Sequence, residues 1–124
     1  MGNITKLEQV SFVVRDLPRA IAFYRFILEL PYIGESDGKA LFQCGAVRLQ
    51  LSLPEKSKLS LASPVLYYHV EDIQGTYRTL YLRGISFEDE PHEVKETGGN
   101  TIMRAYFTDT EGNSIAIQSE VPAI

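Results

Sequence analysis

Polar and aromatic side chains recur at alternate positions in several β-rich stretches of this 124-residue chain. Alternate residues of a strand point to the same face of a sheet, so these side chains are predicted to line a cavity. Aromatic walls with a few fixed hydrogen-bonding groups are typical of a small-molecule pocket, and arginines there suit a carboxylate or phosphate. The predicted ligand-binding residues are Gln9, Ser11, Arg48, Gln50, Tyr67, His69, Arg104, Tyr106 and Gln118.

Several of these residues have an alternative, structural role. The two arginines could lie at strand ends and extend into solvent, and the two tyrosines could belong to the core. His69 and Tyr67 are the candidates for acid–base catalysis, although a single histidine is more often structural. His92 follows a run of acidic residues and is predicted to be a solvated loop residue, and Cys44 is predicted to pack rather than react.

Residues 9–30 supply the first elements that could position these side chains. Alternation at the start predicts a strand, one face of which keeps Gln9 and Ser11 available to a cavity. Asp16 stands where a helix N-cap belongs, and Pro18 falls in the first turn, where a missing N–H is tolerated. The apolar residues that follow recur at helical spacing, which predicts one amphipathic helix packed on a sheet.

The same order of elements begins again 56 residues later, where Asp72 follows a β-rich run as Asp16 does. The repeat predicts an α+β chain of two βαβββ modules, at residues 5–53 and 65–120, joined by a linker at 54–64. A polar loop is expected at 92–101. The other expected elements are a helix at 72–83 and strands at 32–35, 40–44, 47–53, 65–71, 85–88, 101–108 and 114–119.

Two groups of residues, one in each module, carry a resemblance to a known family. The matching residues are Val14-Arg15-Asp16-Leu17, Ala20, Phe23-Tyr24 and Leu28-Glu29-Leu30, then Val70-Glu71-Asp72-Ile73 and Phe107-Thr108-Asp109-Thr110-Glu111-Gly112-Asn113-Ser114-Ile115. With them the chain resembles the vicinal oxygen chelate superfamily, which includes glyoxalase I, extradiol dioxygenases and the bleomycin-resistance proteins. The resemblance implies modules whose mixed sheets curl around a cavity, and it implies a homodimer.

Metal-dependent members of that superfamily place one ligand on the first and one on the last strand of each module. The resemblance puts these four positions at Gln9, Gln50, Val65 and Ala116. Two neutral amides and two hydrocarbon side chains lack the charge that offsets stripping water from a divalent ion. We therefore predict no metal and no other cofactor, with a divalent ion at Gln9 and Gln50 as the alternative.

Composition argues against several other functions. The 12 Lys and Arg are scattered and the formal net charge is −4, which argues against nucleic-acid binding. No apolar segment approaches the roughly 20 residues of a membrane span, and the first residues lack a signal-peptide pattern. Cys44 is the single cysteine, so no internal disulfide is expected and a cytoplasmic location is predicted.

The sequence therefore predicts a metal-free protein of the glyoxalase/bleomycin resistance type that sequesters or senses a small organic ligand. One alternative is a divergent glyoxalase-like lyase or extradiol-type dioxygenase. A second is an enzyme without metal that uses His69 or Tyr67 for proton transfer. A third is a module with a purely structural role.

Overall fold

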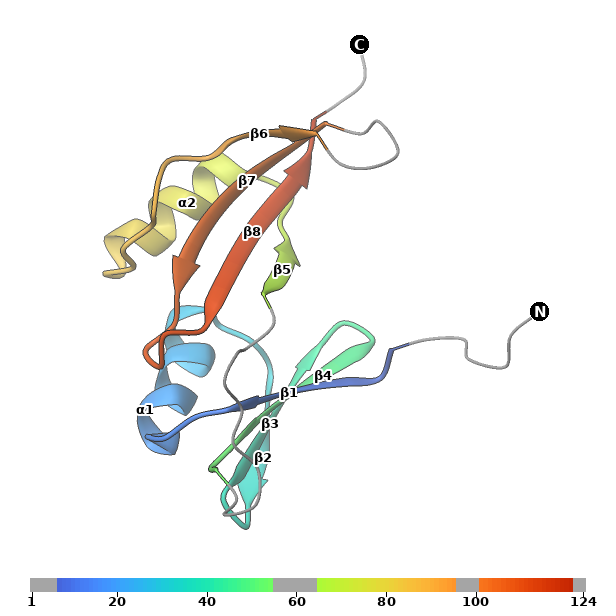
Figure 1. Ribbon diagram of the computed structural model, residues 1–124, viewed down its shortest axis with the longest axis vertical. Helices are drawn as coiled ribbons and strands as arrows, with labels where there is room; N and C mark the ends of the chain where they lie inside the picture. The colour runs from blue at the N-terminus through green and yellow to red at the C-terminus, as the bar shows by residue number, and fades with distance from the viewer. Residues whose placement is uncertain (1–6, 55–64, 96–100, 122–124) are drawn as a thin grey trace, which may run out of the picture. The chain divides into compact units, whose positions relative to one another are not determined.

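The computed structural model describes residues 7–54, 65–95 and 101–121, and the chain divides into two compact units, Met1–Ser63 and Pro64–Ile124. Within the described residues, each unit has one four-stranded mixed sheet and one helical segment (Figure 1). These elements confirm the predicted α+β class and the repeat of two modules. The predicted linker at 54–64 lies outside the described residues, apart from Pro54.

The sheet of the first unit has the strand order β1-β4-β3-β2. β1 is parallel to β4, and the other neighbours are antiparallel. Asp37 and Gly38 both have positive φ, 51° and 75°, as the predicted tight hairpin between β2 and β3 requires. The elements are β1 (Gln9–Val13), α1 (Leu17–Ala22), η1 (Phe23–Ile27), β2 (Tyr32–Ser36), β3 (Lys39–Cys44) and β4 (Val47–Ser52).

The predicted single helix is wrong in its second half. After α1 the backbone widens into the π-helical segment η1, in which the Leu28 N–H donates to the Phe23 carbonyl at 3.0 Å. Two adjacent aromatic side chains in this segment, Phe23 and Tyr24, are both buried, while Phe26 is 65% exposed. A regular helix turns by about 100° per residue, which disfavours burying two neighbouring rings equally.

Asp16 caps α1 as predicted, because its Oδ1 accepts a hydrogen bond from the Arg19 N–H at 3.1 Å. We expect Asp16→Ala to lower the free energy of unfolding by about 1 kcal/mol, since a helix N–H loses its partner. Urea unfolding followed by circular dichroism measures the loss. Asp16→Asn keeps an acceptor oxygen and is the control, so an equal loss in both variants would contradict this role of the carboxylate.

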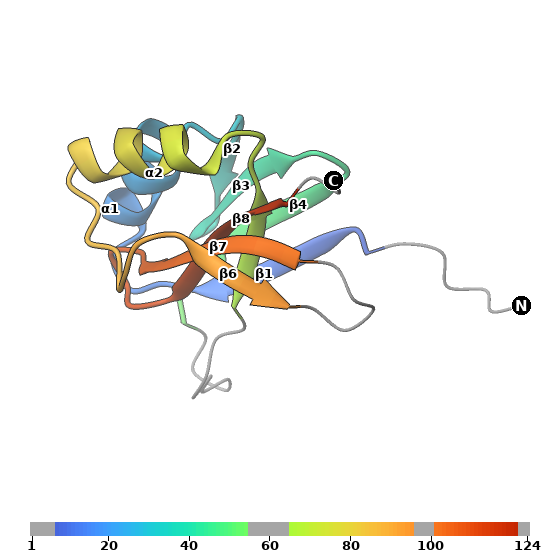
Figure 2. The ribbon, with the colours of Figure 1, turned by 90° about the horizontal axis from the view of Figure 1, so that it is seen from above.

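The sheet of the second unit has the corresponding order β5-β8-β7-β6, again with one parallel pair, β5 and β8. Asp72 caps α2 through a hydrogen bond from the Gly75 N–H to Oδ1 at 3.1 Å, and Gly84, with φ of 95°, follows the helix end. Figure 2 shows α2 running along one side of this sheet. The elements are β5 (Leu66–His69), α2 (Ile73–Leu82), β6 (His92–Lys95), β7 (Thr101–Thr108) and β8 (Ser114–Glu120).

The order of elements between α2 and β7 differs from the prediction. Residues 85–88 form no strand, only an isolated bridge between Phe87 and Phe107, and the edge strand β6 lies in the predicted polar loop. The Phe87 ring packs between Tyr77 and Phe107, with centroids 4.6 and 5.1 Å away, so this segment is anchored by a side chain. β6 is held by backbone pairing to β7, which needs no apolar pattern.

Each sheet has an apolar face on the side of its helix. In the first unit Phe12, Phe42 and Leu51 are at most 1% exposed, and the rings of Phe42 and Tyr24 lie 6.0 Å apart. In the second unit Phe107 and Ile115 are similarly buried. The opposite face of each sheet is therefore left for polar side chains. Within the described part of the chain, no helix is both long and apolar enough to cross a membrane.

Candidate functional site

The polar face of the first sheet carries four of the predicted ligand-binding residues. Gln9 pairs with Arg48, which pairs with Gln43, and Ser11 pairs with Gln50, so all five side chains lie opposite the helix. Gln9 Nε2 donates to Gln50 Oε1 at 3.3 Å, and Gln50 Nε2 donates to Ser11 Oγ at 3.3 Å. Arg48 Nε donates to Gln43 Oε1 at 3.4 Å. The printed hydrogen bonds thus form two separate groups on this face, one of Gln9, Gln50 and Ser11 and one of Arg48 and Gln43.

A recess of about 380 Å³ lies at this end of the first sheet, lined by Glu8, Gln9, Gln43, Ala46 and Arg48. Arg48 is exposed, in agreement with the alternative that its head reaches solvent. Gln43 was not predicted as a site residue. The strand at 40–44 was predicted, and pairing it with the Arg48 strand would have placed Gln43 on the polar face.

The polar face of the second sheet carries the other five predicted residues. One row of side chains crosses all four strands, because His69 pairs with Gln118, Gln118 with Arg104 and Arg104 with His92. In the neighbouring row Tyr67 and Tyr106 flank Ala116. The predicted loop at His92 is wrong, since this residue begins β6 and lies in the row, and its side chain is 40% exposed beside Asp89.

Arg104 is at the centre of this face and is only 7% exposed. Its Nε donates to Gln118 Oε1 at 2.9 Å and its Nη1 donates to Tyr106 Oη at 3.2 Å. Its Cζ lies 4.5 Å from the centroid of the Tyr67 ring and 5.9 Å from that of Tyr106. The alternative that Arg104 extends into solvent is therefore wrong. Contacts with Gln118, Tyr106 and Tyr67 thus fix the orientation of this buried guanidinium.

The two tyrosines differ from simple core residues. Tyr67 is 48% exposed and Tyr106 is half-buried, with their rings 6.3 Å apart in an edge-to-face arrangement. The His92 ring lies 6.4 Å from that of Tyr106. A recess of about 430 Å³ adjoins the row on the β5–β8 side, and its lining includes His69, Gln118 and Glu120. Rings, a cation and amides thus share one face with a recess at its edge.

The histidines face acidic neighbours at the rim. His69 Nε2 lies 3.2 Å from Glu71 Oε1, and both side chains are exposed. His92 Nδ1 lies 3.1 Å from the Glu90 carbonyl and 3.5 Å from Asp89 Oδ1. The described contacts of the two histidines are with these acidic residues and a backbone carbonyl, and none of them places a ring nitrogen beside a nucleophile, as general acid–base catalysis would require.

Cys44 does not add a nucleophile to the site. It is half-buried at the end of β3, and burial raises the pKa of its thiol. A raised pKa lowers the fraction of reactive thiolate at neutral pH. The predicted packing role therefore fits its surroundings.

The four positions that the resemblance assigns to metal ligands do not fit a divalent ion. Gln9 and Gln50 are hydrogen-bonded to each other, and the amide nitrogen of Gln9 faces the oxygen of Gln50. Ala116 is fully buried between Tyr67 and Tyr106 and Val65 is 37% exposed, and neither side chain has a donor atom. Among the described residues, no group of three or more His, Cys, Asp or Glu could hold a metal ion.

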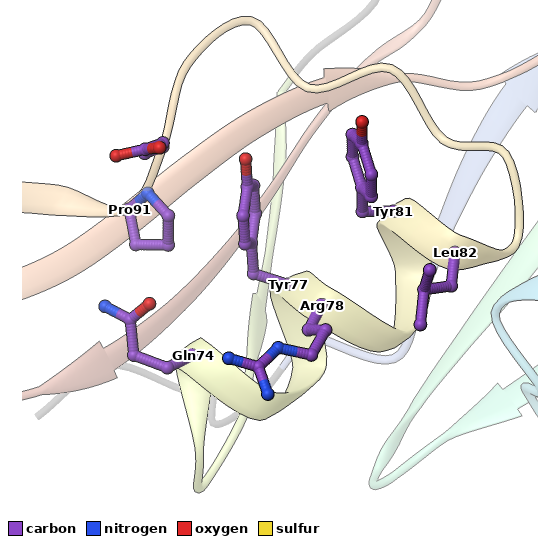
Figure 3. A pocket seen from close by; sticks show the side chains of 7 residues that line it. Gln74, Tyr77, Arg78, Tyr81, Leu82 and Pro91 are labelled. Atoms are coloured by element: carbon purple, nitrogen blue, oxygen red, sulfur yellow. The ribbon is translucent and has the colours of Figure 1, made fainter.

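A further recess, of about 590 Å³, is lined by residues of α2, among them Tyr77, Tyr81 and Leu82, and by Glu90 and Pro91. Figure 3 shows Tyr77 and Tyr81 projecting from α2 on the same side, toward the segment that contains Pro91. Their rings are nearly parallel, with centroids 6.4 Å apart, and Tyr77 also packs on Phe87. Packing within the unit accounts for Tyr77, and Tyr81 and Leu82 are exposed, at 61% and 76%.

Comparison with known proteins agrees with this fold. Residues 6–117 match the Glyoxalase/Bleomycin resistance protein/Dioxygenase superfamily. The uncharacterized protein YraH of Bacillus subtilis (strain 168) is 30% identical over 126 residues, which cover 90% of this chain and 96% of YraH. The structure of lactoylglutathione lyase from Agrobacterium tumefaciens is 22% identical, with a TM-score of 0.71 and 94% of each chain covered.

A second solved structure with this fold is that of TnmS3, an antibiotic-binding protein from Streptomyces sp. CB03234. It is 20% identical, with a TM-score of 0.78, and the match covers 98% of this chain and 100% of TnmS3. The chain therefore belongs to the Glyoxalase/Bleomycin resistance protein/Dioxygenase superfamily, as the residues of its two repeated modules indicated. Membership defines the fold, whereas the reaction or ligand depends on the site residues.

Proposed function

We propose that this protein binds a small organic molecule without a metal ion, and that it sequesters or senses that molecule. The observation that carries the proposal is the chemistry at the four positions where metal-dependent relatives hold an ion. Gln9 and Gln50 satisfy each other there, and Val65 and Ala116 offer no donor atom. A second observation supports it, namely that the nine predicted ligand-binding residues on the polar faces are amides, tyrosines, arginines, a serine and a histidine, and none of them is a carboxylate.

The free energy of dehydrating a divalent ion explains why this donor set disfavours a metal. Ca²⁺ takes 6–8 oxygen ligands and Mg²⁺ about six, usually with carboxylate charge among them. Two neutral amide oxygens supply no charge, and an ion here would also have to break the hydrogen bond between Gln9 and Gln50. Water would then have to fill most of the coordination sphere, which gives little gain over the ion in solution.

The composition of the two faces supports an organic ligand. Small-molecule sites are mostly apolar or aromatic surfaces with a few placed polar groups, and Tyr67, Tyr106, Arg104 and Gln118 have that character. TnmS3, a structure of the same fold, is an antibiotic-binding protein, so the fold can hold an organic molecule. We propose the same general role here, with the ligand bound on the polar faces of the sheets.

Two measurements on the purified protein test the proposal together. Elemental analysis without added metal is expected to find zinc, nickel, manganese and iron far below one ion per chain. Thermal shift against a library of small organic molecules, in EDTA, is expected to give hits, since a ligand at ~100 times its Kd adds about 2.7 kcal/mol of stability. If a hit raises the melting temperature equally in EDTA and after dialysis of the protein against zinc, the ion takes no part in binding that ligand.

Other outcomes would assign the alternatives. One bound ion per chain, with glyoxalase or dioxygenase turnover that EDTA abolishes, would replace the proposal with a lyase or dioxygenase. Turnover that EDTA leaves intact and His69→Ala abolishes would identify an enzyme without metal. A library without a single hit would favour a structural module.

We further propose that the protein is a homodimer in the cytoplasm. The dimer follows from the family resemblance, and the location follows from the single cysteine, Cys44. Light scattering after size-exclusion chromatography measures the first, and a monomer mass at micromolar concentration would contradict it. Fractionation of cells that express the protein measures the second.

A further inference from the structure

We propose that the recess at α2 binds a planar aromatic cation between the rings of Tyr77 and Tyr81. This recess, of about 590 Å³, shares no lining residue with the recesses at the polar faces of the two sheets. The site is therefore built from residues other than those that carry the proposed function, and the inference goes beyond that function. Its volume lies within the roughly 300–1,000 Å³ that small-molecule pockets span.

The two tyrosine rings leave nearly enough room for one flat group between them. Tyr77 and Tyr81 stand one turn of α2 apart, with ring centroids separated by 6.4 Å and ring planes 29° from parallel. Figure 3 shows both rings nearly edge-on with a gap between them. Carbon atoms in contact lie roughly 3.5 Å apart, so a planar group that touches both rings needs about 7 Å between them. The gap therefore has to widen by only roughly 0.6 Å to accept such a group.

One wall of this gap is fixed and the other can adjust. Tyr77 is half-buried and packs on Phe87, whose ring centroid lies 4.6 Å away, and Phe87 in turn packs on Phe107. Tyr81 is 61% exposed, and within the described residues its ring contact is the one with Tyr77. The Tyr81 ring can therefore shift by the small distance required without disturbing the core. Because the Tyr77 wall is already in place, little entropy is lost when a ligand orders the site.

The faces of the two rings favour a positive charge on the ligand. The face of an aromatic ring is its electron-rich side and attracts a cation, and a group between Tyr77 and Tyr81 meets two such faces. The charged residues that line the recess are Arg78 and Glu90, one of each sign, and both are exposed to solvent. Figure 3 shows the Arg78 side chain extending toward Gln74 and not between the rings. Water screens these two opposite charges, so the rings decide which charge is preferred.

Four probes separate planarity from charge in two-dimensional NMR titrations of the full chain at neutral pH. They are the planar cation N-methylquinolinium, neutral quinoline, the planar anion quinoline-2-carboxylate and the non-planar cation cyclohexyltrimethylammonium. We expect N-methylquinolinium to bind about tenfold more tightly than quinoline, because two ring faces contact the charge. The anion and the non-planar cation are each expected to bind more weakly than N-methylquinolinium, through unfavourable charge and through loss of stacking. The largest saturable shifts are expected at the backbone amides of residues 74–82.

Variants assign the binding to the rings and to the charges of the recess. Tyr81→Leu removes one wall and is expected to weaken N-methylquinolinium binding about tenfold, whereas Tyr81→Phe keeps the ring and is expected to bind nearly as before. Glu90→Gln is expected to weaken this binding about twofold and Arg78→Gln to strengthen it about twofold, since exposed charges interact weakly. Phe26→Leu is the matched control, because it removes a ring that is 65% exposed in the other unit, and it is expected to leave the affinity unchanged.

The inference and the proposed function fail in different ways. Equal affinity for N-methylquinolinium and quinoline, equal affinities of Tyr81→Leu and Phe26→Leu, or shifts confined to the polar faces of the sheets would overturn the inference. A library hit in EDTA whose NMR shifts lie on the polar faces would still support the proposed function. Circular dichroism checks that Tyr81→Leu is folded, and if it is not, the wild-type probe series and the position of its shifts decide the outcome.

Discussion

Asp109→Ala is expected to lower the free energy of unfolding by about 3 kcal/mol, because a buried carboxylate organises the turn between β7 and β8. Asp109 and Asn113 are each 6% exposed. Asp109 Oδ1 accepts from the Glu111 N–H at 2.8 Å and the Asn113 N–H at 2.9 Å, and Oδ2 accepts from Asn113 Nδ2 at 2.8 Å. Alanine would leave these donors without that acceptor in a poorly solvated turn.

Urea unfolding of the variant measures this effect. Asp89→Ala is the control, since it removes the same group from an exposed segment and is expected to cost less than about 0.5 kcal/mol. Asp109→Asn is expected to lie between the two, because it keeps one oxygen for both backbone N–H groups but turns an amide NH₂ toward Asn113 Nδ2. A loss in Asp109→Ala no larger than in Asp89→Ala would contradict the structural role of the carboxylate.

The turn matters to the candidate site through the strand that follows it. β8 begins at Ser114 and carries Gln118, which fixes Arg104. The register of β7 and β8 also decides which side chain faces Arg104, because a slip by one residue would turn Gln118 to the other face of the sheet. Asp109 and Asn113 are motif residues that hold the turn. The predicted ligand-binding residues of this hairpin lie two pairs (Tyr106) and four pairs (Arg104 and Gln118) beyond its first pair, Thr108 and Ser114.

Local patterns in the sequence predicted much of the fold. The two aspartates Asp16 and Asp72 mark both helix starts, and Asp37-Gly38 marks a hairpin, because each of these signals works through contacts within a few residues. Strand alternation placed all nine predicted ligand-binding residues on faces turned away from the helices, since the period of two is a property of the backbone. Ligand binding by those residues stays a prediction.

The features that sequence reasoning missed depend on contacts distant in the chain. The π-helical segment contains two adjacent buried rings, Phe23 and Tyr24, and a regular helical period in the sequence cannot show this change of helix type. β6 is an edge strand defined by backbone pairing with β7, and because its sequence lacks an apolar alternation the sequence alone predicts a loop for His92. The burial of Arg104 arises from rings and an amide on three strands, and no local pattern distinguishes it from the exposed Arg48.

Phe42→Ala is expected to lower the free energy of unfolding by about 4 kcal/mol, through lost transfer free energy and the cavity left behind. Phe42 is fully buried, and its ring lies 6.0 Å from that of Tyr24 and 5.3 Å from that of Tyr32. Phe26→Ala is the matched control in the same unit, because the Phe26 ring is 65% exposed and contacts Arg25 at 5.1 Å. We expect that control to cost less than about 1 kcal/mol.

The Phe42 variant also tests how the first unit presents its polar face. Phe42 pairs with Leu49 on the helix side of β3 and β4, whereas Gln43, Arg48 and Gln50 of the same strands point to the other side. If the core fixes these strands, Phe42→Ala should weaken hydrogen-exchange protection across β3 and β4, and Phe26→Ala should not. Phe42→Ala could instead lower stability while the hydrogen-exchange protection of β3 and β4 stays unchanged. That result would show that the two strands keep their register without the Phe42 ring. The hydrogen-bonded pair Gln9–Gln50 would then not depend on the core on the helix side of the sheet.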